Sequence, residues 1–98
     1  MSLKLIVNPD AEADLAEAKQ WYDQRRAGLG DRFLLSVEAV FERICRHPEL
    51  HAIVFRDLRM ALVRRFPYAV IYRVDDDQIT VIAVYHTRRD QRGWQLRA

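Results

Sequence analysis

The sequence has 98 residues, of which 50% are hydrophobic and 31% are charged, and its formal net charge is +2. This length can supply one hydrophobic core but not two, so we expect a single domain over residues 1–98. The only cysteine, Cys45, excludes an intramolecular disulfide and a cysteine-rich metal site.

The first half of the chain is predicted to form a strand and then two helices. Residues 3–7 suit a strand and are too few for a signal peptide or a membrane span, so we expect a cytoplasmic protein without membrane contact. Residues 8–10, Asn-Pro-Asp, are typical of a helix start, and this first helix should stop at Gly28. A second amphipathic helix follows the connector at residues 28–31 and must end near Pro48. So short a connector predicts an antiparallel helix hairpin.

From residue 51 onward the apolar residues recur at every second position, which is typical of strands. We expect three strands, at residues 58–66, 68–74 and 79–86, with a polar turn at residues 75–78. The predicted fold is therefore α+β: an N-terminal strand, a helix hairpin, and an antiparallel meander sheet with the helices packed on one face. The other sheet face carries too many apolar side chains to lie in water, so it must be covered or functional.

The turn at residues 75–78 also predicts a strand register. A two-residue loop at Asp76 and Asp77 gives the pairs Arg73–Thr80, Ile71–Ile82 and Ala69–Val84. This register places Arg73 and His86 on the same face of the sheet. In residues 87–98 the apolar residues show no clear periodicity, and we expect a short helical turn or an ordered tail held by Trp94.

The positive charge is concentrated in the second half of the chain. Residues 1–50 carry seven Lys/Arg against nine Asp/Glu, net −2, whereas residues 51–98 carry nine against five, net +4. All nine of the second half's cations are arginines, whose planar guanidinium groups suit phosphate or carboxylate. The balance favours an anionic partner for this half, although a mixed solvated surface would give a similar count.

Three stretches of the sequence together resemble one protein family. They are AEADLAEAKQWYDQRRAGLGDRF, RFPYAVIYRVDDDQITVIAVYH and HTRRDQRGWQLR, in that order along the chain. Their order and spacing resemble the RelE/ParE toxin superfamily of bacterial type II toxin–antitoxin systems, over nearly the whole chain. The likeness is greatest to the ParE-like, or plasmid-stabilisation, branch. Its typical pattern falls here on Tyr68, Tyr72, His86, Arg89, Asp90 and Trp94.

The resemblance implies a small cytoplasmic toxin that a cognate antitoxin neutralises, with operator DNA contacted only through the antitoxin. True ParE toxins inhibit DNA gyrase, whereas RelE-like relatives cut messenger RNA on the ribosome. The assembly could be a homodimer or a toxin–antitoxin hetero-oligomer. A third alternative is a non-toxic module that only binds an antitoxin. We expect no cofactor and no metal site.

Cleavage of RNA without a metal needs an acid–base residue and cations around the phosphate. His86 and Arg88 are the candidate catalytic residues for this alternative. The second half has no lysine, however, and Ala69 stands where RNA-cleaving relatives have an arginine. Trp94 also replaces their tyrosine, and an indole N–H cannot act as a base. We therefore rank gyrase inhibition by binding first, mRNA cleavage second and the non-toxic module third.

The other candidates are contact and structural residues. Arg89 and Asp90 are expected to form an ion pair that braces the C-terminal segment. His86 has an alternative role as a hydrogen-bond donor to a carbonyl or to Asp90. One of Trp21 and Tyr22 should lie in the core, with the other against a neighbouring strand. The residues expected to contact the target or the antitoxin are Arg59, Arg64, Arg65, Arg73 and Trp94.

Overall fold

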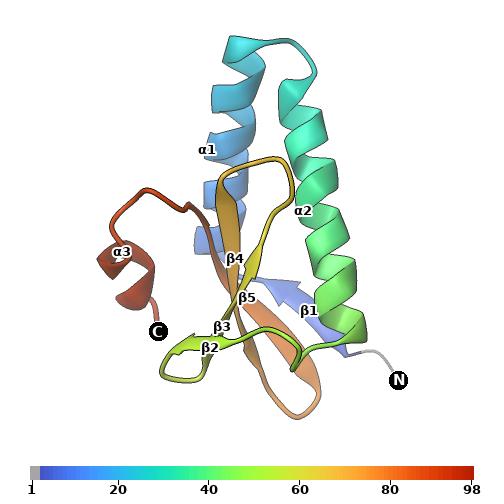
Figure 1. Ribbon diagram of the computed structural model, residues 1–98, viewed down its shortest axis with the longest axis vertical. Coiled ribbons are helices and arrows are strands. Elements are labelled where there is room, and N and C mark those ends of the chain that lie inside the picture. The colour runs from blue at the N-terminus through green and yellow to red at the C-terminus, as the bar shows by residue number, and fades with distance from the viewer. Residues whose placement is uncertain (1–2) are drawn as a thin grey trace.

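The computed structural model describes residues 3–98 as a helix hairpin packed on one face of a five-stranded mixed sheet (Figure 1). The elements are β1 (Lys4–Val7), α1 (Pro9–Arg25), α2 (Leu29–Arg46), β2 (Ile53–Phe55), β3 (Leu58–Leu62), β4 (Tyr68–Val74), β5 (Gln78–His86) and α3 (Arg92–Gln95). The α+β class, the N-terminal strand and the helix hairpin are confirmed. Within residues 3–98, no helix combines the length and the apolar character that crossing a bilayer requires.

The strand order in the sheet is β1-β5-β4-β3-β2. Strands β2 to β5 form the predicted antiparallel meander, and β1 adds to its edge by pairing in parallel with β5. The observed strands differ from the prediction in two respects. The three-residue strand β2 was not predicted as a separate element, and the strand predicted at residues 58–66 ends at Leu62. It ends there because Arg65 has a left-handed backbone (φ 70°) and Pro67 has no N–H for a strand ladder.

The two helices of the hairpin approach each other closely. Gly28 adopts a left-handed conformation (φ 85°), so α2 begins at Leu29, inside the connector predicted at residues 28–31. A Cβ added to Gly30 would lie 2.5 Å from the carbonyl oxygen of Lys19 on α1. The Gly30 N–H also donates to the Asp23 carboxylate at 2.8 Å. Glycine at this position therefore fixes how tightly the hairpin closes.

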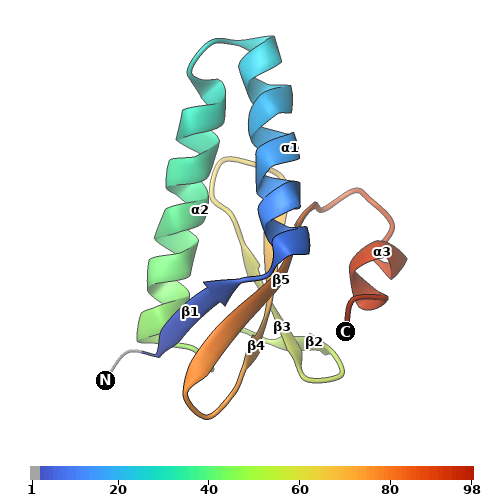
Figure 2. The same ribbon diagram turned by 180° about the vertical axis from the view of Figure 1, so that it is seen from behind.

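The sheet separates two hydrophobic clusters. The larger one lies between the sheet and the hairpin, and its helical part includes Tyr22, Phe33 and Val37. The smaller one lies on the opposite sheet face, where the C-terminal segment passes beside the sheet to α3 (Figure 2). It contains Leu58, Ile71, Ile82, Ala83 and Trp94. The face expected to be covered or functional is thus covered by the C-terminal segment, and the prediction that Trp94 holds an ordered tail is confirmed.

The register between β4 and β5 changes part-way along the hairpin. Arg73 pairs with Thr80 as predicted, and the Asp75 N–H donates to the Gln78 carbonyl across the two-residue loop. A bulge then inserts Ile82 as an extra residue in β5. The predicted pairs beyond it are therefore wrong, because each shifts by one residue. The observed pairs are Ile71–Ala83, Ala69–Tyr85 and Tyr68–His86.

The bulge also reverses which face each later β5 side chain occupies. Ile82 and Ala83 are consecutive, yet both belong to the cluster on the sheet face away from the hairpin, and Val84 returns to the hairpin side. His86, which pairs with Tyr68, therefore lies on the hairpin side, whereas Arg73 lies on the other face. The prediction that these two residues share a face is wrong for this reason.

Candidate functional site

The predicted histidine lies in a pocket between α1 and the end of β5. The pocket has a volume of about 400 Å³ and is partly open to solvent. Beyond it the chain leaves β5 and arches away from α1 toward α3 (Figure 2). The lining residues are Asp14, Glu17, Ala18, Gln20, Trp21, Gln24, Tyr68, Val84, His86 and Arg89. We call this hollow the β5-end pocket.

The pocket exists because β5 is longer than its neighbour β1. Pairing with β1 stops at Val81, where the Asn8 N–H donates to the Val81 carbonyl at 3.0 Å and the chain turns into α1. Among residues 3–98, no strand pairs with this edge of β5 beyond Val81. An ion pair satisfies backbone groups of β5 there instead.

Asp14 on α1 and Arg97 near the C-terminus form a bidentate pair, with N–O distances of 2.7 and 3.1 Å. The Asp14 carboxylate accepts the Val84 N–H at 3.0 Å, and the Arg97 guanidinium donates to the Ile82 carbonyl at 3.0 Å. Both partners are more than two-thirds buried, with 19% and 29% of their side chains exposed. The hydrogen bond to Asp14 raises the pKa of Arg97. The pair thus satisfies the backbone at the bulge and ties the C-terminus to α1.

His86 has one ring nitrogen already engaged. Its Nδ1 accepts a hydrogen bond from the Arg88 backbone N–H at 3.1 Å, so the proton of the neutral ring lies on Nε2. The predicted donation to a carbonyl or to Asp90 is absent among the described residues. The ring also packs edge-on against Tyr68, with centroids 5.3 Å apart. Burial raises the pKa of the Tyr68 hydroxyl, so this phenol stays protonated at neutral pH.

Arg88 and Arg89 are both exposed, but only Arg89 lines the β5-end pocket. Arg89 lies 3.7 Å from the Glu17 carboxylate on α1. The predicted ion pair between Arg89 and Asp90 is wrong, because Asp90 instead binds the Arg92 side chain at 2.6 Å and its backbone N–H at 2.9 Å. These bonds lower the pKa of Asp90. Asp90 therefore shapes the turn into α3, whereas Arg89 bridges to α1.

Two of the predicted contact arginines have internal partners. Arg59 donates to the Glu49 and His51 carbonyls at 3.1 and 2.7 Å, which fixes the loop between α2 and β2. Arg73 pairs with Asp57 at 3.1 Å. Contact with a target stays a prediction for both residues, and these internal bonds argue against it.

Arg64 and Arg65 lie in the segment between β3 and β4, both exposed, beside α2 rather than beside His86. Trp94 is 3% exposed, and its Nε1 has no hydrogen-bond partner among the described residues. It is a core residue, and although its contact with the target or the antitoxin stays a prediction, this burial argues against it. Tyr22 is in the core, and Trp21 is 47% exposed, with the Arg25 guanidinium over its ring. Trp21 lines the β5-end pocket together with Tyr68 and His86, on the side of α1 that faces the strands.

The β5-end pocket has little unpaired positive charge to offer a phosphate. Its two carboxylates are each paired with an arginine, Asp14 with Arg97 and Glu17 with Arg89. The charge of Arg89, the arginine among the lining residues, is therefore balanced by Glu17. His86 has a single N–H to offer and no unoccupied ring acceptor. The structure thus gives the predicted catalytic pair no phosphate clamp.

Asp14, Glu17 and Arg97 were missed by reasoning from the sequence. In the sequence, Asp14 and Glu17 look like ordinary solvated charges on the first helix. Arg97 lies in residues 87–98, where the apolar residues show no helical or strand periodicity. The one available signal was the length difference between residues 3–7 and residues 79–86. A short strand beside a long one leaves polar backbone groups that charged side chains can satisfy.

Comparisons with known proteins agree with this fold. The model of the family "ParE toxin of type II toxin-antitoxin system, parDE" matches residues 5–91. Toxin ParE2 of Mycobacterium tuberculosis is 37% identical over 87 residues, which cover 88% of this chain and 83% of that protein.

Two solved structures have a similar fold. A mutant of the E. coli toxin RelE in the free state has a TM-score of 0.69 at 16% identity, covering 90% of this chain and 86% of that one. The toxin–antitoxin complex RelBE2 of M. tuberculosis gives a TM-score of 0.64 at 22% identity, covering 88% of this chain and 99% of that one.

Proposed function

Because the chain belongs to the ParE toxin family of type II toxin–antitoxin systems, we propose that it inhibits DNA gyrase by binding and that a cognate antitoxin neutralises it. One observation supports binding over RNA cleavage: Arg59, Arg64, Arg65 and Arg73 do not converge on His86, and only Arg88 and Arg89, which follow it closely in the sequence, lie near it. Arg59 and Arg73 serve internal partners, and Arg64 and Arg65 lie beside α2. A phosphoryl-transfer site needs its cations around one phosphate.

Two local features of the β5-end pocket add to this argument. The His86 Nδ1 lone pair is used by the Arg88 N–H, so the ring would have to break that bond before this nitrogen could take a proton. The charge of Arg89, the arginine that lines the pocket, is balanced by Glu17, so little positive charge is left for a phosphate. Both features are compatible with a pocket that receives a side chain of a protein target.

The proposal of an antitoxin partner rests on family membership and on the solved relatives. The M. tuberculosis relative was solved as a toxin–antitoxin complex, and its fold covers 88% of this chain. An antitoxin must cover whichever surface engages the target, and operator DNA is then reached through the antitoxin.

The decisive experiment compares two activities of the same purified, antitoxin-free protein. It is titrated into DNA gyrase acting on relaxed plasmid and, in parallel, into a translating extract with a labelled mRNA. We expect supercoiling to stop while the mRNA stays intact.

Cleaved mRNA with unaffected gyrase would contradict the proposal. If that cleavage disappeared in a His86→Ala/Arg88→Ala variant, the endonuclease alternative would be established. Normal growth of cells that express the chain alone, with neither activity in vitro, would instead identify the non-toxic antitoxin-binding module.

A further inference from the structure

One wall of the β5-end pocket comes from a single side of α1. Four of the helix residues that line it recur every three or four positions, which places them in one row along the helix. They are Asp14, Glu17, Trp21 and Gln24. Trp21 is the large aromatic member of this row and is 47% exposed, whereas its neighbour Tyr22 is buried in the core. The fold thus uses one aromatic ring of this pair for packing and presents the other at the pocket.

The indole of Trp21 is held in a fixed orientation. The Arg25 guanidinium lies over the ring, 3.9 Å from its centroid. The ring of Tyr22 meets it at an interplanar angle of 90°, with centroids 5.0 Å apart. Because these contacts order the indole before a partner arrives, little side-chain entropy is left to lose on binding. Rigid aromatic rings of this kind are enriched among the residues that dominate binding energy at protein interfaces.

The inner part of the β5-end pocket is apolar. Three buried residues contribute to it, namely Ala18, Tyr68 and Val84. Burial raises the pKa of the Tyr68 hydroxyl, so this side chain adds no charge at neutral pH. With the indole of Trp21 beside them, these residues suit a flat, largely apolar group.

The ion pairs of the pocket disfavour a charged occupant. Asp14 is bound by Arg97 at 2.7 Å, and Glu17 lies 3.7 Å from Arg89. A cation would compete with these arginines for the carboxylates, and an anion would compete with the carboxylates for the arginines. An uncharged group disturbs neither pair.

Polar groups at the rim supply hydrogen bonds to such a group. Gln20 and Gln24 are exposed lining residues, and each amide can donate and accept. The His86 ring adds one N–H, because its Nδ1 is engaged by the backbone N–H of Arg88. A single hydrogen bond of this kind is modest, so substitution of His86 should change affinity by no more than about threefold.

The size and openness of the pocket indicate how its occupant is presented. Its volume of about 400 Å³ lies toward the lower end of the range for ligand pockets, roughly 300–1,000 Å³. It is also partly open, with Gln20, Trp21 and Gln24 exposed along one side. A free small molecule would keep much of its surface in water here, whereas a side chain carried by a protein brings a surface that closes the opening.

We propose that the β5-end pocket binds an uncharged aromatic side chain with a polar edge, such as tyrosine, from the protein that the toxin inhibits. This inference rests on the proposed function and adds to it a binding subsite and a class of side chain. The ring of Trp21 makes the main contact, and the amides of Gln20 and Gln24 bind the polar edge.

The chemistry of the pocket is tested by NMR titration of the full-length toxin. The chain has two tryptophans, and Trp94 is a built-in reference because it is buried on the opposite sheet face. N-acetyltyrosinamide at millimolar concentration should shift the indole N–H signal of Trp21 and leave that of Trp94 unchanged. N-acetylargininamide and adenosine monophosphate should shift neither signal.

The role of the pocket is tested by inhibition of gyrase supercoiling. Trp21→Ala should raise the inhibitory concentration at least about tenfold. The matched control is Leu62→Ala, which changes an apolar residue that is 61% exposed and outside the pocket lining, and it should stay within about threefold of wild type. Gln20→Ala/Gln24→Ala changes only exposed positions, so it should fold normally and raise the inhibitory concentration at least about threefold.

The outcomes separate the pocket assignment from the proposed function. If wild-type toxin inhibits gyrase and both pocket variants inhibit it equally well, the inference is overturned and the proposed function stands. A Trp21 signal that responds to N-acetylargininamide or adenosine monophosphate, but not to N-acetyltyrosinamide, would show that the assigned chemistry is wrong. Gyrase that is unaffected by wild-type toxin would overturn the proposed function, and the NMR titration would then decide the chemistry of the pocket by itself.

Discussion

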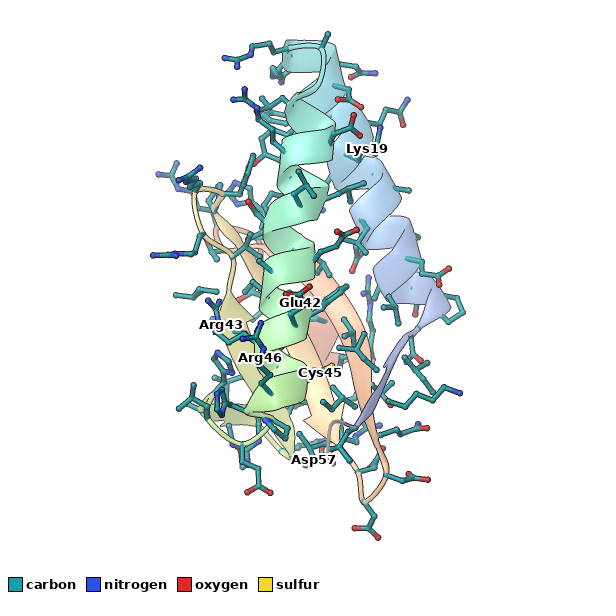
Figure 3. The ribbon with its side chains drawn as sticks, turned by 90° about the vertical axis from the view of Figure 1, so that its right-hand side faces the viewer. Lys19, Glu42, Arg43, Cys45, Arg46 and Asp57 are labelled. Carbon is teal, nitrogen blue, oxygen red and sulfur yellow. The ribbon has the colours of Figure 1, made fainter. Side chains whose placement is uncertain are left out.

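Two regions of the molecule are rich in arginine, but their arginines have opposite surroundings. One is the C-terminal segment, residues 86–98. The other is the basic groove, the hollow between α2 and the segment joining β3 to β4, whose lining includes Arg32, Arg43, Arg64 and Arg65. Three of the four C-terminal arginines have carboxylate partners: Arg89 with Glu17, Arg92 with Asp90 and Arg97 with Asp14. In the basic groove, none of the four arginines has such a partner among residues 3–98. Figure 1 shows α3 and α2 on opposite sides of the molecule, and Figure 3 looks onto α2 with Arg43 labelled.

This difference distinguishes arginines whose charge is used within the fold from arginines whose charge is available to a partner. Arg97 and Asp14 saturate one another and the bulged backbone, so little of their field reaches solvent. The groove arginines have no carboxylate partner among residues 3–98, so their charge remains available at the surface. The buried pair of Arg97 and Asp14 therefore stabilises the fold, and arginines without an internal partner lie beside α2. Four predictions test this division.

The largest effect is expected at Trp94. Trp94→Ala should lower the free energy of unfolding by about 3–5 kcal/mol, because the indole fills the cluster on the far sheet face at 3% exposure. Urea unfolding measures the change. Trp94→Phe is the matched control and should cost less, since it keeps an aromatic ring and removes the Nε1–H that has no partner. Equal losses in both variants would show that the packing argument is wrong.

A smaller loss is expected at the ion pair beside the bulge. Arg97→Met should lower the free energy of unfolding by about 1–2 kcal/mol, because the Asp14 carboxylate and the Ile82 carbonyl lose their donor. Thermal unfolding at neutral pH provides the measurement. Arg92→Met, which breaks an ion pair whose arginine is 83% exposed, should leave stability unchanged. If both changes had the same effect, the contrast between buried and exposed pairs would fail.

Charge reversal in the basic groove should barely alter stability. Arg43→Glu/Arg64→Glu is expected to stay within about 0.5 kcal/mol of wild type, because neither arginine has an ion-pair partner to lose. The same urea series serves as the measurement. A loss as large as that of Arg97→Met would mean that these arginines are structural, and the comparison of the two regions would not hold.

The smallest expected effect is a change in the pKa of one side chain, His51. Burial, followed by the charges of Arg43 and Arg59, lowers the pKa of His51. The folded state therefore resists protonation, so His51 should reduce stability as the pH falls below its unfolded pKa, about 6.5. Arg43→Gln should raise the pKa of His51, as measured by NMR titration. An unchanged pKa in the variant would contradict the assigned cause.

Much of the fold was predictable because apolar residues recur at regular helical or strand spacing along much of the sequence. The apolar stripe of α2 and the Asn-Pro-Asp start of α1 each have a direct physical cause in the sequence. The bulge was not predictable, because residues 79–84 are nearly all apolar and show no alternation from which one inserted residue could be detected. The faces of His86 and Arg73 were therefore predicted incorrectly.

The candidate site was harder to predict than the fold, because its charges pair over long sequence distances. Asp14 and Arg97 are 83 residues apart, and only the short β1 and the turn into α1 bring them together. Arg89 and Asp90 are adjacent in sequence, yet they bind different partners because Asp90 accepts bonds from the turn that follows it. Sequence proximity was thus a poor guide to ion pairing. The family resemblance was unaffected, because it rested on the order and spacing of three stretches of sequence and not on which residues form ion pairs.

The most direct test of binding over cleavage is a gyrase titration with wild-type toxin and the His86→Ala/Arg88→Ala variant side by side. Neither residue belongs to the basic groove, and the β5-end pocket gives His86 no phosphate clamp. We predict that both proteins stop supercoiling, with inhibitory concentrations within about threefold of each other. Gyrase that is unaffected by wild-type toxin, while that toxin cleaves mRNA and the variant does not, would contradict the account.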